Sequence, residues 1–269
     1  HVGRFILCLL ALVLQLFMEL LLIWLAAVSD RAKYTAAPGL QDNVDIALRW
    51  LSDASPLCKA AITAHWLDSL SFLLVFLATV LSPLWDQVPF SGFAMASRMM
   101  LTIATSRLLR CACFMATILP SPRPGCYRRK FPPVPESVWE IIAYPFSHIS
   151  CAGGCNDLIF SGHCGFWTTS LLVFNTYYRG HTGCLALLAL GLLQTAARDV
   201  VERYHYSVDM ILAVFCTWAV WRWLEPVYPA SAILKPRPPG FPSDPRPPGV
   251  MLLAGAAVLG GLSVIISLD

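Results

Sequence analysis

Residues 5–28 read FILCLLALVLQLFMELLLIWLAAV, an apolar run that only Gln15 and Glu19 interrupt. The hydrocarbon core of a bilayer is about 30 Å thick, and roughly 20 apolar residues of α-helix are needed to cross it. A run of this length and composition therefore predicts a transmembrane helix, not a helix buried in a soluble core.

The composition of the whole chain also indicates a protein that lies largely in lipid. Of its 269 residues, 57% are hydrophobic and 13% are charged, whereas soluble proteins average about 45–50% and about 25%. A soluble globule of this size could not bury so much apolar surface, so a soluble enzyme, a disordered tail and a nucleic-acid binder are excluded. The net charge of +3 is too small to indicate a polyanionic partner. The expected partner is the lipid bilayer.

Further apolar runs extend this pattern along the chain, at residues 57–84, 93–119, 158–178, 182–197 and 208–224. With residues 5–28 they predict an all-α fold, a polytopic membrane helix bundle of six transmembrane helices within a single membrane domain, residues 1–225. Residues 226–249 are rich in proline and predict an extended linker. Residues 250–269 form either a seventh transmembrane helix or a tail.

Counting the crossings places three segments between spans on one side of the membrane. They are the segment after the first span, the long loop 120–157 and the charged segment 198–205. Basic residues divide almost evenly between the two sides, so the positive-inside rule does not orient the bundle. Cys126, Cys151 and Cys155 lie on the long-loop side. A disulfide between Cys126 and one of the other two would form if that side faces an oxidising compartment.

Two histidines stand out, because ionisable groups at membrane depth are costly and usually mark function. His163 follows Ser161 and Gly162 at the predicted start of a helix, where backbone N–H groups can hold an oxyanion. His205 precedes Asp209 by four residues, so the carboxylate lies on the same helix face and can fix the imidazole tautomer. The alternative is that His205 and Asp209 form a helix-capping ion pair at the interface.

Both histidines enter the membrane from the same side, which predicts a site of two histidines and one carboxylate. Arg198 and Arg203 are close enough in sequence to clamp a phosphate, and the combination indicates phosphoryl transfer. Glu19, midway through the first span, either contacts substrate or pairs with Arg107 or Arg110. Metal-ligand spacing is absent, so neither a metal nor another cofactor is expected.

The motifs around the two histidines resemble a known family. FSGH at 160–163 and HYSVD at 205–209 resemble the paired motifs of the type-2 phosphatidic acid phosphatase superfamily. The longer string GCNDLIFSGH at 154–163 resembles its sphingolipid synthase branch, which contains sphingomyelin synthases and inositol phosphorylceramide synthases. PGLQD at 38–42 and RCACFMATILPSP at 110–122 are weaker matches to the same branch.

The chain departs from that branch at several positions. Asn156 stands where the branch commonly has glycine, and Arg198 lies seven residues before His205, which is not the phosphatase spacing. Arg203, two residues before His205, is similar to the plant-type inositol phosphorylceramide synthases. Sphingomyelin synthases usually have an acidic residue where this chain has Tyr204.

The resemblance implies a two-step transfer. His205, activated by Asp209, attacks the phosphorus of a glycerophospholipid and becomes a phosphohistidine that carries phosphoinositol or phosphocholine. His163 protonates the departing diacylglycerol and then takes the proton from the primary hydroxyl of ceramide. The residues expected to bind the substrate phosphate are Ser161, Gly162, Arg198, Arg203, Asp157 and Arg110.

The resemblance also implies a multi-pass protein of the Golgi, plasma or endoplasmic reticulum membrane, with the site facing the lumen or the exterior. The basic residues at 123–130 would then form a surface for anionic lipids. If water replaced ceramide, the same residues would give a lipid phosphate phosphatase or a phospholipase C-type hydrolase. A non-catalytic transporter or scaffold is the third interpretation, and the intact His163, His205 and Asp209 disfavour it.

Overall fold

The computed structural model of the chain describes residues 2–34, 39–63, 71–85, 90–148, 154–178 and 182–230. Within these ranges the chain forms α-helices and connecting loops, which confirms the all-α prediction for the described residues. The predicted seventh span at 250–269, nearly all of the proline-rich linker and Cys151 lie outside them.

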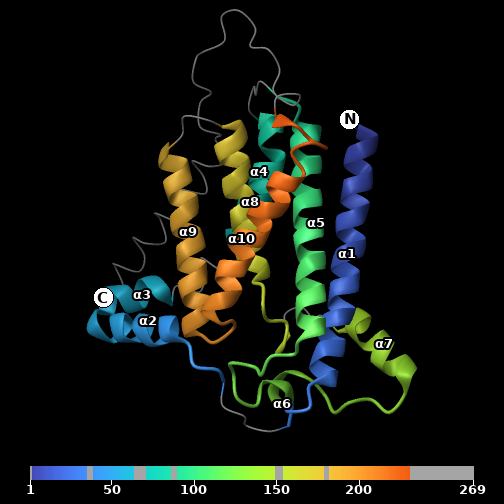
Figure 1. The fold of residues 1–269 in the computed structure, drawn as a ribbon, viewed down its shortest axis with the longest axis vertical. Helices are drawn as coiled ribbons and strands as arrows, with labels where there is room; N and C mark the ends of the chain where they lie inside the picture. Colours follow the sequence, from blue (N-terminus) through green and yellow to red (C-terminus); the bar gives the residue numbers. More distant parts are fainter. Residues whose placement is uncertain are drawn as a thin grey trace, which may run out of the picture.

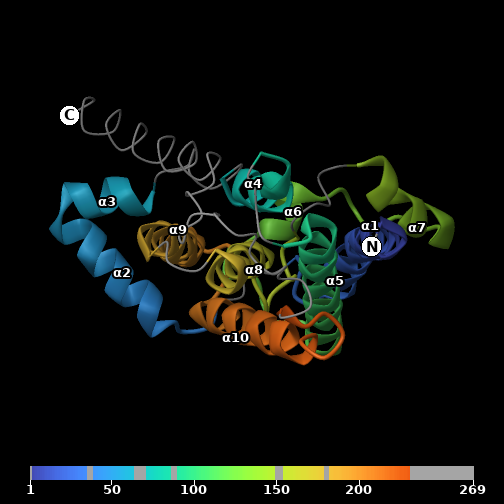
Figure 2. The same cartoon turned by 90° about the horizontal axis from the view of Figure 1, so that it is seen from above.

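The long helices of the fold run side by side along one direction, as Figure 1 shows, and appear as neighbouring rods in the end-on view of Figure 2. They are α1 (Val2–Ser29), α4 (Ser71–Trp85), α5 (Gly92–Ala116), α8 (Gly162–Tyr177), α9 (Thr182–Val201) and α10 (Ser207–Trp223). Of these, α1, α5 and α9 are long and apolar enough to cross a membrane. The protein is therefore a helical membrane protein, and the total of six crossings stays a prediction.

The start of the second predicted span needs a correction. A continuous helix was expected over residues 57–84, but residues 56–62 form a separate short helix, α3 (Pro56–Ile62), and α4 begins at Ser71. The start of α3 has a local cause, because Ser55 accepts a hydrogen bond from the Cys58 amide and Pro56 occupies the first helical turn; at its other end the Thr63 amide donates to the Lys59 carbonyl and caps the helix. Ser55 and Pro56 both favour the beginning of a new helix.

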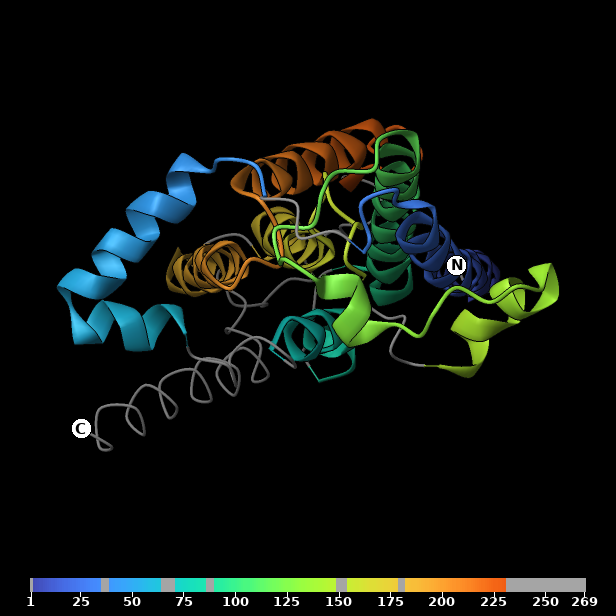
Figure 3. The same cartoon turned by 90° about the horizontal axis from the view of Figure 1, so that it is seen from below.

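An amphipathic helix that the sequence analysis did not predict, α2 (Asn43–Ala54), precedes α3. Asp42 caps it by accepting hydrogen bonds from the amides of Val44 and Asp45. Figures 1 and 3 show α2 and α3 at the outer side of α9, at the end of the bundle where α9 finishes. The contact includes a hydrogen bond from Arg49 to the carbonyl of Val201, the last residue of α9.

The same end of the bundle carries the long loop, which contains α6 (Cys126–Lys130) and α7 (Val138–Ser147). Trp24, near the end of α1, is fully buried against this loop. Its indole Nε1–H donates to the Ile141 carbonyl at 2.9 Å, and its ring contacts Tyr144 and Phe131. Burial of this large aromatic surface fixes the loop to the end of α1.

Charged side chains also join the helices in the interior of the bundle. Glu19 of α1 accepts hydrogen bonds from Arg107 of α5 at 2.7 and 2.9 Å, and it also pairs with Arg110. Arg110 in turn donates to Asp157 in the segment before α8, at 2.7 Å. Glu19 is thus the partner of both arginines, and the opposite charges compensate the cost of placing ions at this depth.

We expect Glu19→Ala to destabilise the protein strongly, because it leaves two buried guanidinium groups without their shared carboxylate. Removing one partner of a buried ion pair typically costs about 3–5 kcal/mol. The measurement is the thermal midpoint of the purified protein in detergent. Glu140→Ala removes an exposed carboxylate of α7 and should leave the midpoint unchanged. Equal midpoints for the two variants would contradict the role given to Glu19.

Candidate active site

The ends of four helices bring the predicted site residues together. The last turns of α5 and α9 and the first turns of α8 and α10 lie at the same end of the bundle, beside the long loop (Figures 1 and 3). The first turn of α8 carries His163, and the turn between α9 and α10 carries His205. Both histidines line one cavity of about 370 Å³.

Asp209 holds the imidazole of His205. Asp209 is fully buried in the first turn of α10, and its Oδ2 lies 3.0 Å from His205 Nδ1. The same oxygen accepts the Tyr206 amide at 3.1 Å, and Oδ1 accepts the Ile159 amide at 2.9 Å. Asp209 therefore caps α10 and contacts His205 at once, so the capping pair is observed, and the role of Asp209 in catalysis stays a prediction.

The environment of His205 favours a basic imidazole. Burial alone would lower the pKa of His205, but the hydrogen bond to Asp209 and the nearby carboxylates of Asp199 and Asp157 outweigh burial and raise that pKa. Because an ionised carboxylate only accepts hydrogen bonds, Nδ1 carries the proton in the neutral ring. The lone pair of neutral His205 is then on Nε2, the nitrogen away from Asp209.

The turn that carries His205 is anchored from two distant segments. The Tyr206 hydroxyl donates to the Pro120 carbonyl at 3.0 Å and accepts the Leu40 amide at 2.9 Å. Asp42 accepts hydrogen bonds from the Ser207 amide and hydroxyl at 2.6 and 2.9 Å. These contacts bring the described part of the PGLQD segment, residues 39–42, to the base of α10, next to the site.

The start of α8 presents a close approach between a glycine and an arginine. Ser161 caps the helix by accepting the Cys164 amide at 3.4 Å. A Cβ atom on Gly162 would lie 2.7 Å from Nη1 of Arg107, so only glycine leaves room for that guanidinium. Arg107 therefore lies against the first turn of α8, where the helix dipole also favours an anion.

Backbone strain accompanies both histidines. Ile159, four residues before His163, has φ of 74°, and Arg203, two residues before His205, has φ of 58°. Such left-handed conformations are unfavourable for a β-branched residue such as isoleucine, and they tend to gather at functional sites. At Ile159 the hydrogen bond from its amide to Asp209 holds the strained turn in place.

His163 has a carboxylate partner that the sequence analysis missed. Its Nδ1 lies 3.7 Å from Oδ2 of Asp199, a residue buried near the end of α9. The side chain of His163 itself is 43% exposed, so its ring reaches from the buried carboxylate into the cavity. The crossing count was the signal available, since it places the end of α9 on the same side as His163.

The cavity around the histidines is lined by several cationic side chains: Arg107, Arg110, Arg123 and Lys130. Asp157 lies on the same wall. Burial alone would raise the pKa of Asp157, but Arg110 and His205 outweigh burial and hold that pKa at about 2. Asp157 is thus an anion that orients Arg110, and Arg110 also donates to the Phe160 carbonyl at 2.6 Å, directly before Ser161.

Two arginines that were expected at the phosphate have other surroundings. Arg198 forms an ion pair with Glu202 at 3.1 Å. Arg203 lies 3.7 Å from Asp45 and lines a neighbouring cavity of about 320 Å³ that also reaches His205. Among the described residues, neither lines the cavity that contains both histidines.

Arg123 and Lys130 come instead from the run of basic residues in the long loop, which the resemblance assigned to an anionic lipid surface. The guanidinium of Arg123 stacks 3.3 Å from the centre of the Tyr204 ring and donates to the Arg203 carbonyl at 3.2 Å. The long loop is thereby attached to the turn that carries His205, and its charge faces the cavity.

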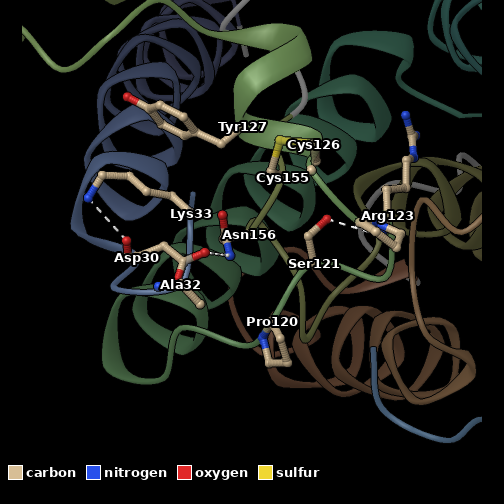
Figure 4. A pocket seen from close by; sticks show the side chains of 12 residues that line it. Asp30, Ala32, Lys33, Pro120, Ser121, Arg123, Cys126, Tyr127, Cys155 and Asn156 are labelled. Atoms are coloured by element: carbon tan, nitrogen blue, oxygen red, sulfur yellow. Dashed lines mark hydrogen bonds between the residues drawn. A yellow bond between two sulfur atoms is a disulfide. The ribbon is translucent and has the colours of Figure 1, made fainter. Parts of the chain in front are cut away.

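A disulfide between Cys126 and Cys155 ties the long loop to the segment before α8. Figure 4 shows this bond beside Asn156, whose amide points to Asp30 at the end of α1. Asn156 Nδ2 donates to Asp30 Oδ2 at 3.0 Å and to the Leu119 carbonyl at 2.9 Å. The asparagine that departs from the branch pattern therefore connects the segment before α8 to α1 and to the chain after α5.

Comparisons with known proteins agree with the motifs. A family model described as PAP2 superfamily C-terminal matches residues 154–227, which contain both histidines. Protein PHLOEM UNLOADING MODULATOR of Arabidopsis thaliana is 26% identical over 69% of this chain and 57% of its own length. Phosphatidylinositol:ceramide inositolphosphotransferase 3 of Arabidopsis thaliana is 31% identical over 50% of this chain and 47% of its own length.

A phosphatidylinositol:ceramide inositolphosphotransferase of Oryza sativa subsp. indica is 32% identical over 43% of this chain and 36% of its own length. The chain thus spans about half or less of the length of most of these relatives. The matches confirm the resemblance that the motifs predicted: residues 154–227 match the PAP2 superfamily C-terminal model, and the chain is similar to the sphingolipid synthase branch of that superfamily.

Proposed function

We propose that the protein is a membrane phosphotransferase that moves the phospho-head group of a glycerophospholipid to ceramide and releases diacylglycerol. The observation that carries the proposal is the pair of histidines on one cavity wall, each with its Nδ1 facing a carboxylate. Phosphatidylinositol is the proposed donor, because the relatives include enzymes named phosphatidylinositol:ceramide inositolphosphotransferase.

In the first step, Nε2 of neutral His205 attacks the phosphorus of the donor lipid. The nitrogen–phosphorus bond forms, the bond from phosphorus to the diacylglycerol oxygen breaks, and His163 gives its Nε2 proton to that oxygen. Asp209 stabilises the positive charge that develops on the His205 ring as it becomes substituted. The head group and its phosphate remain on the protein while diacylglycerol leaves.

In the second step, the primary hydroxyl of ceramide attacks the phosphohistidine. His163, now neutral, takes the hydroxyl proton at Nε2, the new oxygen–phosphorus bond forms, and the bond to His205 breaks. Dividing the displacement in two lets one site accept two bulky lipids in succession. The arginines of the cavity and the first turn of α8 support the charge on the phosphoryl oxygens.

Arg107 is the cation best arranged to contact the phosphate. It is held by two hydrogen bonds to Glu19 and lies against Gly162, so its position relative to His163 is fixed. Such pre-arranged charge stabilises a transition state without reorganising during the reaction. Arg198 and Arg203 were expected in this role, and we now assign it to Arg107 with Arg123 and Lys130 nearby.

An apolar groove of about 570 Å³ offers a place for a lipid chain next to the site. Its lining comes from α8, α9 and α10 and includes Cys164 and Met210, which directly follow His163 and Asp209 in the sequence. Leu193, Ile211 and Phe215 line its outer part. A lipid whose acyl chain occupied this groove would have its polar end near the two histidines.

The Cys126–Cys155 disulfide supports a site that faces an oxidising compartment, because such bonds persist in the secretory lumen and outside the cell and are rare in the cytosol. Golgi, plasma and endoplasmic reticulum membranes all offer such a face. A head group too polar to cross the bilayer requires the donor, the acceptor hydroxyl and the histidines to be on one side.

Hydrolysis is the second candidate function, because the 43% exposure of the His163 side chain gives water access to the position of the acceptor. The test is to incubate the purified protein with labelled ceramide and, separately, with phosphatidylinositol, phosphatidylcholine or phosphatidylethanolamine. We expect inositol phosphorylceramide and diacylglycerol, and no product with His205→Ala. Release of the free phospho-head group, or of phosphate from phosphatidic acid, without a ceramide product would favour the hydrolase.

We expect Gly162→Ala to lower transfer by about tenfold or more while the protein stays folded. The added Cβ displaces the end of the Arg107 side chain from the first turn of α8, and an electrostatic contact of this kind is worth at least that factor. Gly183→Ala is the matched control, because no atom lies within 4 Å of a Cβ at that position of α9. Equal rates for both variants would remove Arg107 from the phosphate site.

The rate should depend on pH through His205. Its pKa is raised in the folded protein, and only the neutral ring is a nucleophile, so transfer should increase as the pH rises through that raised pKa. Asp209→Asn removes the interaction that raises the pKa, so the acid limb should move to lower pH while the maximal rate falls. A limb that stays in place, measured as transfer rate against pH, would contradict the assignment of the limb to His205.

A further inference from the structure

Asp199 has a geometry that gives the second histidine the same support as the first. Its Oδ2 lies 3.7 Å from His163 Nδ1 and accepts the Ser161 hydroxyl at 3.5 Å. Its main-chain carbonyl accepts the amides of Tyr204 at 2.8 Å and His205 at 3.2 Å. One buried residue at the end of α9 therefore contacts both histidine segments.

The carboxylate of Asp199 lies beside Nδ1 of the His163 ring. Asp199 is 2% exposed, whereas the ring of His163 extends into the cavity. A buried carboxylate beside Nδ1 favours the tautomer with its proton on Nδ1, and it stabilises the ring when both nitrogens are protonated. The reacting nitrogen is then Nε2, as it is in His205.

We propose that Asp199 is a positioning residue that fixes the tautomer of His163 and stabilises its protonated form, so that His163 can deliver a proton to the leaving diacylglycerol oxygen. This role rests on the proposed transferase function. The site then contains two carboxylate–histidine pairs, His205 with Asp209 for attack on phosphorus and His163 with Asp199 for proton transfer.

The two pairs should respond differently to the leaving group. In the first step the proton moves from His163 Nε2 to the diacylglycerol oxygen while the nitrogen–phosphorus bond forms at His205. A p-nitrophenyl phosphodiester carrying the same head group leaves as a stabilised phenolate and does not need that proton. Attack by His205 is required for both donors, but proton delivery is required only for the lipid.

The experiment measures product release in the first turnover, without ceramide, from phosphatidylinositol and from the p-nitrophenyl diester. Asp199→Asn keeps the shape of the side chain and the main-chain carbonyl. We expect it to slow diacylglycerol release on the order of 10²-fold and to leave nitrophenolate release within a few-fold of the wild type. His163→Ala should give the same pattern, and His205→Ala should abolish both releases.

A purely structural role of Asp199 predicts another outcome, in which Asp199→Asn slows both donors equally while His163→Ala still slows only the lipid. That result, or an unchanged rate with the lipid, would overturn the proposal. Failure of the wild-type protein to release product from either donor would contradict the proposed function itself, and the role of Asp199 with it.

Asp199 is buried, so its replacement can affect folding. A second variant therefore changes the partially exposed residue of the same contact, His163. Replacement of His163 by Nδ-methylhistidine fixes the lone pair on Nε2 without help from Asp199, but it removes the Nδ1–H through which Asp199 would stabilise the protonated ring. We expect this protein to show the selective loss of diacylglycerol release that Asp199→Asn shows. Full activity with the lipid donor would overturn the proposal even if Asp199→Asn did not fold.

Discussion

The carboxylate of Glu19 inside the bundle is the constraint on which the rest of the structure depends. An ionised group at this depth is tolerated only with partners, and Glu19 has two, Arg107 and Arg110 of α5. Arg110 also forms an ion pair with Asp157, which lies in the segment leading to α8. A single buried acid of the first helix thereby sets the position of the segment that leads into α8, whose first turn carries Gly162 and His163. The same acid holds Arg107 against that turn. Stability and site geometry share this network.

The second histidine, His205, lies in the turn between α9 and α10, and this turn must be held next to the first turn of α8. Asp209 does so through three hydrogen bonds, to His205, to the amide that begins α10 and to the strained Ile159 next to α8. The disulfide and Arg123 attach the long loop to the same two segments. The result is a polar site built from four helix ends, with an apolar groove between α8, α9 and α10 beside it. This arrangement suits a reaction in which two lipids present their polar ends in turn.

Much of this could be predicted from sequence because the strongest signals are local. The length of the apolar runs predicted the membrane-spanning helices α1, α5 and α9. The four-residue spacing of His205 and Asp209 predicted their contact. The end of α3 at Ile62 was missed because a count of apolar residues over 57–84 does not show where a helix is capped, as it is here at Thr63. The role of Arg198 as a phosphate ligand stays a prediction, because nearness in sequence does not show which way a side chain points, and in the structure Arg198 forms an ion pair with Glu202, one turn away. Asp199 was missed because its partner, His163, lies on another helix.

The central claim is that His205 carries the phospho-head group between two lipids. The most direct measurement uses phosphatidylinositol labelled at the phosphorus, incubated with the protein without ceramide and quenched in alkali, in which phosphohistidine survives. The account predicts label on the peptide that contains His205, its loss when ceramide is added before the quench, and its transfer into the ceramide product. Transfer to ceramide at the normal rate with no label on the protein at any time would contradict the account, because the head group would then pass between the lipids in a single displacement.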